Sequence, residues 1–514
     1  MRIIRTCREM GLATVAVYSA CDRNALHVRL ADEAHAIGPD QASESYLRID
    51  KLMDVAGASG ADAVHPGYGF MAENAEFAEA CGAAGVTFIG PSASVMRAMG
   101  SKTSARTIAV AAGVPVVPGG NTPDDIGCPM LVKAVAGGGG KGMRVVRSVD
   151  DLKSAVELAQ SEALSSFGSS EVYFERLIER ARHIEVQLLG DRYGTIVPFV
   201  ERECSIQRRH QKLIEETPSA AVSPELRERL MRAAIAIGRA ASYTSAGTME
   251  FLVDANGDFY FLEMNTRLQV EHPITEAVTG VDFVRAQIEI AKGAKLAEMA
   301  DLKVGPTTDA APANGHAIEV RVYAENPDAG FLPSPGRITH LRAPSGPGIR
   351  DDSGAFEGWT VPNAYDPLVS KVVAWAPDRP RAIARMVRAL TEYDLRGIST
   401  TIGFCREVIA SPAFAAAEFD TTYVDRLLEQ NGPKVAKADE LEETAAIVAA
   451  MFWSKRDAGL KASTTTDTGT TTDTRSTTGT SEVVADKPVM VPTFRSAKNG
   501  ESLWARSARL ESLR

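Results

Sequence analysis

Two glutamates in residues 247–273 are spaced to share one side of a β-hairpin. Apolar and polar residues alternate on both sides of Asn256-Gly257, the dipeptide most typical of a two-residue hairpin turn. With these two residues as the turn, Glu250 lies directly opposite Glu263, and such side chains are about 5 Å apart at Cβ. Two carboxylates this close repel each other unless one keeps its proton or a cation lies between them.

Polar side chains continue beyond the second predicted strand. Asn265, Arg267, Gln269 and Glu271 occupy every second position, which predicts one polar face along an extended segment. Carboxylate and amide oxygens are ligands that Mg²⁺ and Mn²⁺ accept, usually beside substrate phosphates. A solvated face of charged residues is the alternative interpretation. We favour a metal-centred active site in which Glu250, Glu263 and Asn265 are the metal ligands.

A glycine-rich run, residues 137–142, lies between two short segments that read as strands. It matches G-x-G-x-x-G formally, but the dinucleotide-binding fingerprint requires a helix after the glycines. A P-loop is excluded because no Ser or Thr follows Lys141. Exposed backbone N–H groups beside a lysine suit a mobile flap over phosphates. A plain flexible turn is the alternative.

Composition limits the class of protein. The chain has 514 residues, enough for about three domains, and its net charge of −10 argues against a general nucleic-acid binder. Six scattered cysteines without a CxxC pair indicate reduced thiols. No apolar run is long enough to span a membrane, and the start does not resemble a signal peptide. We therefore expect a cytoplasmic protein that binds neither nucleic acid nor membrane.

The sequence pattern also predicts the helices and strands that must position these residues. Residues 1–10 read as a helix and 14–18 as a strand, and a βαβ rhythm continues to about residue 90, which predicts a parallel sheet. Helices are predicted at 224–241 and 378–395, with a strand-rich stretch at 316–371. Residues 463–481 are almost all Thr, Ser, Asp and Gly, which predicts disorder.

Several long segments resemble the biotin carboxylases of the ATP-grasp superfamily, over about residues 1–430. The likeness rests on HPGYGFMAENAEFA, FIGPS, MGSKTSAR, GGGGKGMRVV, ERECSIQRRHQKLIEE, EMNTRLQVEHPITE, HAIEVRVYAE and FLPSPGRI. The resemblance implies an α/β and α+β multidomain fold. Its expected parts are a Rossmann-like domain at 1–98, an ATP-grasp domain at 99–298 with a lid at about 130–190, a C-terminal domain at 312–430, and a low-complexity tail at 431–514.

The resemblance also implies roles for individual residues. ATP binding is expected at Lys102, Lys133, Gly138, Gly139, Gly140, Glu175, Arg176, Leu177, Ile178, His183, Gln207, His210, Glu250 and Glu263. Bicarbonate binding is expected at Arg267, Gln269 and Val270. Catalytic roles are expected for four residues: Glu271 as the base that deprotonates bicarbonate, Lys212 beside phosphate and bicarbonate, Arg267, and Arg321, which stabilises the biotin enolate.

The implied reaction is ATP-dependent carboxylation of biotin by bicarbonate, with ADP and phosphate as products. Expected cofactors are ATP, two Mg²⁺ or Mn²⁺ ions and bicarbonate. The chain contains no Ala-Met-Lys-Met-like biotinylation site, so biotin should arrive on a separate carrier protein. We therefore expect a homodimeric subunit of an acetyl-CoA or propionyl-CoA carboxylase, working with that carrier and a carboxyltransferase subunit.

Two departures from the family pattern bear on these expectations. Met1 falls inside the family's first helix, so the opening strand is missing, and an upstream start is one explanation. The stretch between Pro118 and Pro129 is short, and we expect altered packing there rather than lost catalysis. His65, Tyr68 and His272 are interpreted as structural, and Cys204 as a packing residue.

Three other functions remain open from the sequence. The chain could be the biotin carboxylase subunit of a pyruvate or urea carboxylase, because the carboxyl acceptor is chosen by the separate transferase. It could be another ATP-grasp ligase, such as a carbamoyl-phosphate-synthase-like enzyme, although no second ATP-grasp half is visible. It could also be a catalytically impaired scaffold, because of its clipped start.

Overall fold

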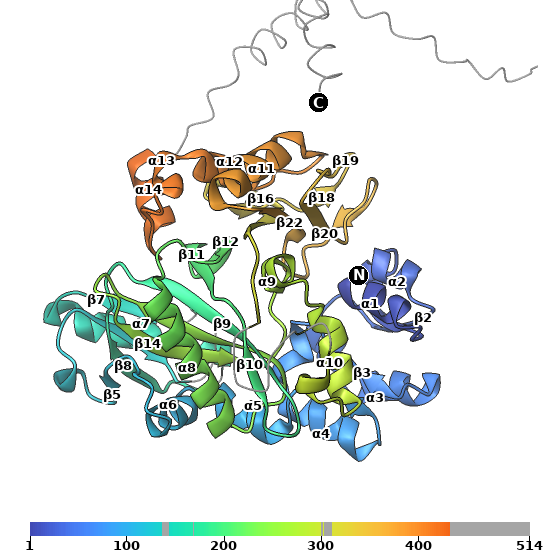
Figure 1. Cartoon of the computed structure of the whole chain (residues 1–514), viewed down its shortest axis with the longest axis horizontal. Helices are drawn as coiled ribbons and strands as arrows, with labels where there is room; N and C mark the ends of the chain where they lie inside the picture. The colour runs from blue at the N-terminus through green and yellow to red at the C-terminus, as the bar shows by residue number, and fades with distance from the viewer. Residues whose placement is uncertain (136–142, 168, 300–301, 303–310, 432–514) are drawn as a thin grey trace, which may run out of the picture. The chain divides into compact units, whose positions relative to one another are not determined.

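The computed structural model describes residues 1–135, 143–167, 169–299, 302 and 311–431. The predicted flap at 137–142 and almost all of the predicted tail lie outside these residues, and so do Gly138, Gly139 and Gly140. None of the helices in the described part combines the length and apolar character that a membrane span needs. Figure 1 shows the arrangement of the described elements.

The N-terminal region alternates helices with short parallel strands, as predicted. Its elements are α1 (Arg2–Glu9), β1 (Val15–Ser19), α2 (Leu26–Leu30), β2 (Glu33–Gly38), α3 (Ile49–Ser59), β3 (Ala63–Val64), α4 (Ala75–Ala83), β4 (Thr87–Phe88), α5 (Ala93–Gly100) and α6 (Lys102–Ala111). The predicted parallel pairing is confirmed, but the strands form more than one sheet. β1 pairs with β2, and β3 with β4, as two separate parallel pairs among the described residues, because no strand there hydrogen-bonds to both.

A small antiparallel sheet follows, in the order β5-β8-β6-β7. It contains β5 (Gly119–Gly120), β6 (Met130–Ala134), β7 (Met143–Val146) and β8 (Val172–Arg176), and helix α7 (Val149–Phe167) packs on it. Val132, Val146, Ala159 and Phe174 form its core. Between residues 118 and 129 the only helical element is one 3₁₀ turn, Pro123–Asp125, as the short segment predicted.

A nine-stranded sheet carries most of the site, and its main path is β14-β13-β9-β11-β12-β15-β22-β20, with β10 beside β9. The strands are β9 (Arg182–Gly190), β10 (Ile196–Pro198), β11 (Arg202–Arg208), β12 (Gln211–Thr217), β13 (Ser245–Val253), β14 (Phe259–Asn265), β15 (His316–Tyr323), β20 (Ile349–Ser353) and β22 (Leu368–Ala376). β12 pairs with β15, so the sheet continues across the predicted boundary between the ATP-grasp and C-terminal domains.

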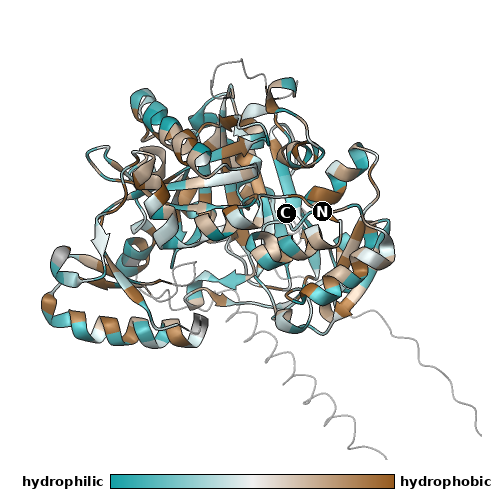
Figure 2. Ribbon diagram, turned by 90° about the horizontal axis from the view of Figure 1, so that it is seen from below, coloured by the Kyte–Doolittle hydropathy of each residue, from teal (hydrophilic) through white to brown (hydrophobic). Residues whose placement is uncertain are grey.

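Helices cover this sheet. They are α8 (Pro224–Ala240), α9 (His272–Thr279), α10 (Phe283–Ala291), α11 (Arg379–Glu392), α12 (Ile402–Ala410), α13 (Pro412–Ala415) and α14 (Tyr423–Asn431). Three two-stranded pairs complete the C-terminal part: β16 (Glu325–Asn326) with β17 (Leu332–Pro333), β18 (Gly336–Arg337) with β21 (Thr360–Val361), and β19 (His340–Arg342) with β23 (Asp394–Arg396). Along α8, apolar residues three to four positions apart (Leu230, Ala234, Ile237) are buried in the same core cluster as Leu188 of β9. Brown and teal alternate along the helices in Figure 2, as this amphipathic pattern requires.

The hairpin β13–β14 confirms the predicted pair and corrects the predicted turn. Glu250 is opposite Glu263. The loop, however, contains three residues, 255–257, because Asp254 and Asp258 form the closing pair and Gly257 has φ 80°. The Asp254 carboxylate accepts the N–H groups of Asn256 and Asp258, at 2.9 and 3.0 Å. A bulge between Glu250 and Phe251 then shifts the register by one residue and restores the glutamate pair.

Candidate active site

Charged side chains form one row across four neighbouring strands. Glu263 of β14 is opposite Glu250 of β13, Glu250 is opposite Glu185 of β9, and Glu185 is opposite Arg202 of β11. Directly opposed residues lie on the same face of a sheet. The hairpin therefore supplies two carboxylates of a row that the wider sheet extends with Glu185, a residue that sequence analysis missed.

Glu250 is the most heavily contacted carboxylate of this row. Its Oε1 accepts hydrogen bonds from Lys212 (3.0 Å), Asn265 (2.9 Å) and Gln269 (3.0 Å). His183 Nε2 lies 3.2 Å from its Oε2. Burial would raise the pKa of Glu250, but the charges of Lys212 and His183 outweigh it and hold that pKa well below the usual range. For Glu263, burial and the charge of Glu250 raise the pKa.

Lys212 connects three carboxylates. Its ammonium donates to Glu185 (2.7 Å), Glu250 (3.0 Å) and Glu271 (2.5 Å). It reaches them from β12, and its side chain is only 11% exposed. Burial lowers the pKa of Lys212, but these neighbouring negative charges raise it well above its ordinary value. Lys212 is therefore a fixed positive charge between the predicted metal carboxylates and the predicted base.

Glu271 lies between two cations. Its Oε1 accepts from Lys212 and its Oε2 from Arg321, at 2.9 Å. Arg321 also donates through Nε to Glu215, at 2.6 Å. Burial would raise the pKa of Glu271, whereas Lys212, Arg321 and Arg202 hold it well below normal. The structure thus brings together three of the four predicted catalytic residues and keeps Glu271 ionised.

The segment after β14 is not the extended polar face that alternation predicted. β14 ends at Asn265 and α9 begins at His272. The Arg267 side chain donates hydrogen bonds to Asn265 Oδ1 (2.9 Å) and to the Glu73 carboxylate (3.0 Å). Gln269 and Glu271 reach the same face of the sheet through a turn and a helix start, because the backbone leaves the strand after Asn265.

Of the two predicted phosphate lysines, Lys133 lies in β6 and Lys102 at the start of α6. Lys133 is buried and forms an ion pair with Glu175, which also accepts from Arg106 at 3.0 Å. Lys102 Nζ lies 3.4 Å from the Ala134 carbonyl oxygen. Burial lowers the pKa of Lys102, and Lys133 contributes to that shift. A cavity of about 480 Å³ adjoins Lys102 and Tyr173 and is lined in part by the short segment at Gly119, Gly120 and Asn121.

The other predicted nucleotide-binding residues lie on β8, after β8 and on the β11–β12 hairpin. Arg176 is exposed and donates to the Tyr260 hydroxyl at 3.2 Å. Leu177 and Ile178 follow β8, and the Leu177 N–H donates to Pro129 O at 3.1 Å. Gln207 is buried opposite Lys212. His210 is at the exposed tip of the β11–β12 hairpin.

That hairpin tip carries a strained backbone. Arg209 and His210 form its two-residue turn with φ of 48° and 65°. Positive φ is uncommon for such side chains and costs about 1–3 kcal/mol when the surrounding structure imposes it. Although His210 is exposed at this tip, partial desolvation lowers its pKa, and the charges of Lys133 and His183 lower that pKa further.

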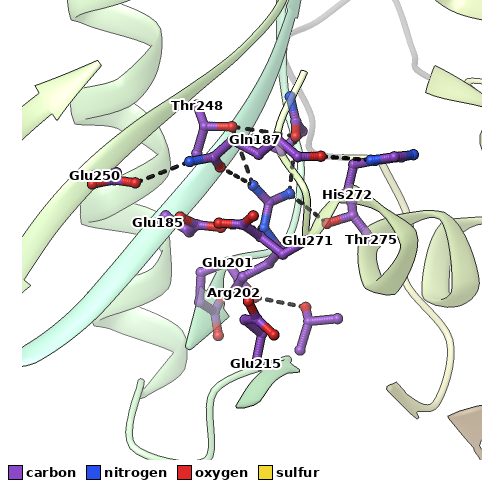
Figure 3. A network of polar contacts seen from close by, with 12 residues as sticks. Glu185, Gln187, Glu201, Arg202, Glu215, Thr248, Glu250, Glu271, His272 and Thr275 are labelled. Carbon is purple, nitrogen blue, oxygen red and sulfur yellow. Dashed lines mark hydrogen bonds and ion pairs between the residues drawn. The ribbon is translucent and has the colours of Figure 1, made fainter. Parts of the chain in front are cut away.

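Arg202 lies at the centre of the polar network in Figure 3. Its side chain is fully buried and pairs with Glu185. It also donates to Gln187 (3.0 Å), Thr275 (2.9 Å), Thr248 (3.2 Å) and Gln269 (2.7 Å). Sequence analysis missed both Arg202 and Glu185. The available signal was a charged residue inside an otherwise apolar strand pattern, as in HIEVQLL (183–189).

This donor set is suited to a divalent cation. Glu250 and Glu263 are opposed, and ligand atoms of His183, Glu185 and Glu250 lie within 4.8 Å of one another. A divalent cation would relieve the repulsion that raises the pKa of Glu263. The Asn265 oxygen accepts from Arg267 in this structure, so Asn265 would have to reorient to act as a ligand.

Comparisons with known proteins give family matches over three consecutive parts of the chain. Sequence models match residues 1–96 (biotin carboxylase, N-terminal domain), 98–299 (carbamoyl-phosphate synthase L chain, ATP binding domain) and 319–426 (biotin carboxylase C-terminal domain). A pyruvate carboxylase subunit of Methanothermobacter thermautotrophicus is 47% identical over 481 residues, covering 91% of this chain and 96% of that protein. Biotin carboxylase of Nostoc sp. is 48% identical over 438 residues, covering 83% and 96%.

A solved structure gives the same fold. It is the biotin carboxylase domain dimer of Hydrogenobacter thermophilus 2-oxoglutarate carboxylase, in complex with MgADP, ADP and bicarbonate. It is 42% identical, with a TM-score of 0.78, and the match covers 83% of this chain and 94% of that one.

Proposed function

Because the chain belongs to the biotin carboxylase family of ATP-grasp enzymes, we propose that it carboxylates biotin on a separate carrier protein, using ATP and bicarbonate. The observation that carries this proposal is the position of Lys212, which contacts Glu250 and Glu271 together. One buried ammonium thereby connects the carboxylates suited to a metal with the carboxylate suited to bicarbonate. Such an arrangement would hold ATP and bicarbonate next to each other, beside charged side chains whose positions are fixed.

Residues of this chain have distinct roles in the first stage. Lys102, Lys133 and Lys212 neutralise phosphate charge, while Arg267, Gln269 and the backbone of Val270 bind bicarbonate. Glu250 and Glu263 would hold Mg²⁺ or Mn²⁺, which supplies charge neutralisation at the transferring phosphate when it is bound. Glu271 takes the bicarbonate proton as bicarbonate attacks the γ-phosphate, giving carboxyphosphate and ADP.

The low pKa of Glu271 in the free enzyme has a consequence for this step. Lys212 and Arg321 both donate to it, which makes it a weak base. A bound bicarbonate and the ATP phosphates would compete for these cations, and losing their charge would raise the pKa of Glu271. Substrate binding therefore activates the base.

Arg321 acts in the second stage. Carboxyphosphate breaks down to CO₂ and phosphate, the phosphate accepts the N1 proton of biotin, and CO₂ is attacked by that nitrogen. Arg321 stabilises the negative charge on the ureido oxygen. It is held in place by Glu215 and Glu271. Closing the site keeps carboxyphosphate from water.

We propose an acetyl-CoA or propionyl-CoA carboxylase as the full system. A pyruvate carboxylase is the second candidate, favoured by the 47% identity to a subunit of that enzyme. The proposal further includes a homodimer, a cytoplasmic location, a carrier protein and a separate carboxyltransferase. The dimer of the 2-oxoglutarate carboxylase domain supports the homodimer, and six free cysteines support the cytoplasmic location. The division into domains at 1–98, 99–298 and 312–430 also remains a proposal, close to the matched ranges.

The test is ADP release with free biotin as acceptor, measured with and without bicarbonate and with and without Mg²⁺. We expect turnover that requires all three, with only slow ATP hydrolysis when bicarbonate is absent. Turnover that ignores biotin would indicate another ATP-grasp ligase, and no turnover would indicate a scaffold. Glu271→Gln should abolish carboxylation while ATP binding, measured by calorimetry, stays within about twofold of the unmodified protein.

A further inference from the structure

Every acceptor oxygen of the Gln269–Val270 segment is already occupied. Gln269 Oε1 accepts from Arg202 Nη2, the Gln269 carbonyl contacts His272 Nδ1, and the Val270 carbonyl accepts from Lys371 Nζ, each at 2.7 Å. The Gln269 amide nitrogen, at the opposite end of its side chain, points to Glu250 at 3.0 Å. The two residues thus direct their oxygens toward buried donors and keep an N–H₂ group for the charged face of the sheet.

The three donors are all deeply buried. Arg202 and His272 are fully buried, and Lys371 is 3% exposed. Arg202 is fixed by its contacts with Glu185, Gln187, Thr248 and Thr275, which Figure 3 shows converging on its guanidinium. Burying cations costs free energy unless they are hydrogen-bonded. Arg202 and Lys371 are such cations, and their contacts with this segment supply part of the hydrogen bonding that they need in the interior, whereas His272 donates as a neutral ring.

Lys371 is tied to the site by the sheet itself. It is opposite Arg321 in the register of β15 and β22. Its ammonium lies 3.9 Å from Asp352 and 5.6 Å from the centre of the Tyr68 ring. The Val270 carbonyl at 2.7 Å is its hydrogen-bond partner. Sequence analysis gave Lys371 no role.

We propose that Arg202, His272 and Lys371 are positioning residues that turn all acceptors of Gln269 and Val270 away from the anion pocket, so that the segment offers the anion only N–H groups. This inference rests on the proposed bicarbonate site. An amide side chain can present either its oxygen or its nitrogen, and an oxygen facing an anion is repulsive. The buried Arg202 decides which end faces the pocket. Bicarbonate carries one O–H of its own, and Glu271 is the acceptor placed to receive it.

The arrangement also fixes the state of His272. Because its Nδ1 is 2.7 Å from a carbonyl oxygen, that nitrogen must carry the hydrogen. Its Nε2 is buried without a hydrogen-bond partner among the described residues. Burial, together with the charge of Lys371, holds the pKa of His272 well below its usual value. His272 therefore stays a neutral donor, as its interpretation as a segment-fixing residue requires.

Two substitutions test the inference by steady-state kinetics. Lys371→Met removes the donor to Val270, and Arg202→Lys keeps a positive charge beside Glu185 but cannot also reach Gln269. Each should raise the KM for bicarbonate at least tenfold while the KM for ATP stays within twofold. Lys371→Arg should restore most of the loss, and Lys292→Met, at an exposed lysine (52% exposed side chain), serves as the matched control. A purely structural role would lower kcat through a smaller active fraction and leave both KM values unchanged, which would overturn the inference.

A binding measurement separates this inference from the proposed function. Line broadening of ¹³C-bicarbonate by the full chain is followed by NMR for the unmodified protein and for Lys371→Met. Binding that is lost in Lys371→Met supports the inference even if no biotin-dependent turnover is found. Equal binding in both proteins, or no binding by the unmodified protein, overturns it.

Discussion

Two pairs of directly opposed glutamates, all buried except the half-buried Glu263, lie in the same sheet and differ in their surroundings. Glu250 is opposite Glu263, and Glu215 is opposite Glu319. Glu250 is contacted by Lys212, Asn265, Gln269 and His183. In the second pair, Arg321 contacts one oxygen of Glu215, while Glu215 Oε2 and both Glu319 oxygens have no hydrogen-bond partner among the described residues.

The protonation of the two pairs differs accordingly. The pKa of Glu250 is held well below normal, whereas burial raises the pKa of Glu215 to about 7 and that of Glu319 well above its ordinary value. Opposition of two carboxyls on a sheet therefore does not define a metal site. Glu250 stays ionised beside its donors, whereas the raised pKa values of Glu215 and Glu319 favour a proton on the second pair.

The largest expected effect on activity comes from a substitution in the first pair. Glu250→Gln removes the ionised carboxylate that the proposed metal site needs, so bicarbonate-dependent ADP release should fall about 100-fold or more. Mn²⁺ affinity, measured by electron paramagnetic resonance, should fall as well. Glu319→Gln is the matched control, since it makes the same change in the other pair. Equal losses in both variants would show that the two pairs do not differ in function.

Lys212→Met should give the largest effect on stability. It leaves Glu185, Glu250 and Glu271 buried without their shared cation, a change that typically costs about 3–5 kcal/mol. Because Glu250 and Glu271 have lowered pKa values in the fold, the stability they contribute is present above their unfolded pKa of 4.5 and is lost on acidification. The difference in urea midpoint from the unmodified protein should thus be larger at pH 7.5 than at pH 4. A difference independent of pH would contradict this explanation.

A smaller effect should appear in the pH dependence of the second pair. The pKa of Glu215 is raised from 4.5 to about 7, so the folded state binds its proton more tightly than the unfolded state. Its contribution to stability is complete below pH 4.5 and disappears as the pH rises through 7. Glu215→Gln should therefore flatten the decline in urea midpoint between pH 5 and pH 8. An unchanged slope would mean that Glu215 is already ionised at pH 5.

The smallest effect is expected from Glu319→Gln. Burial raises the pKa of Glu319 well above its ordinary value and so favours its protonated form, which a neutral amide of similar shape resembles in charge. The free energy of unfolding at pH 7 should shift by about 1 kcal/mol or less, and ADP release should stay within twofold. A large loss in either measurement would show that Glu319 is ionised in the fold and acts as a partner of Lys371.

The β13–β14 hairpin shows why its prediction succeeded only in part. Alternation and the Asn256-Gly257 signal identified the two strands and the Glu250–Glu263 pair. The loop is one residue longer than predicted, and the bulge after Glu250 compensates for that residue. The alternation of apolar and polar residues did not reveal this bulge, which lies between β13 and β14, while β13 pairs with β9 without a register shift.

The carboxylate row shows a second limit of sequence reasoning. Glu250 and Glu263 are 13 positions apart and connected by a tight turn, so their proximity follows from the chain itself. Glu185 and Arg202 reach the same row from strands far away in the sequence. Lys371 lies in β22, in the C-terminal part of the chain. It is opposite Arg321 because β22 pairs with β15. Such contacts require the order of strands in the sheet, which periodicity does not specify.

The sequence by itself determined the family, the strand pairing of Glu250 with Glu263, and the residue types that could bind phosphate, metal and bicarbonate. Local motifs suffice for these because they depend on neighbours along the chain. Only the tertiary structure decided which carboxyls stay ionised, which residues share Lys212, and which way the Gln269 amide faces. Protonation and hydrogen bonding depend on burial and on charges brought from distant strands, and neither exists until the sheet is assembled.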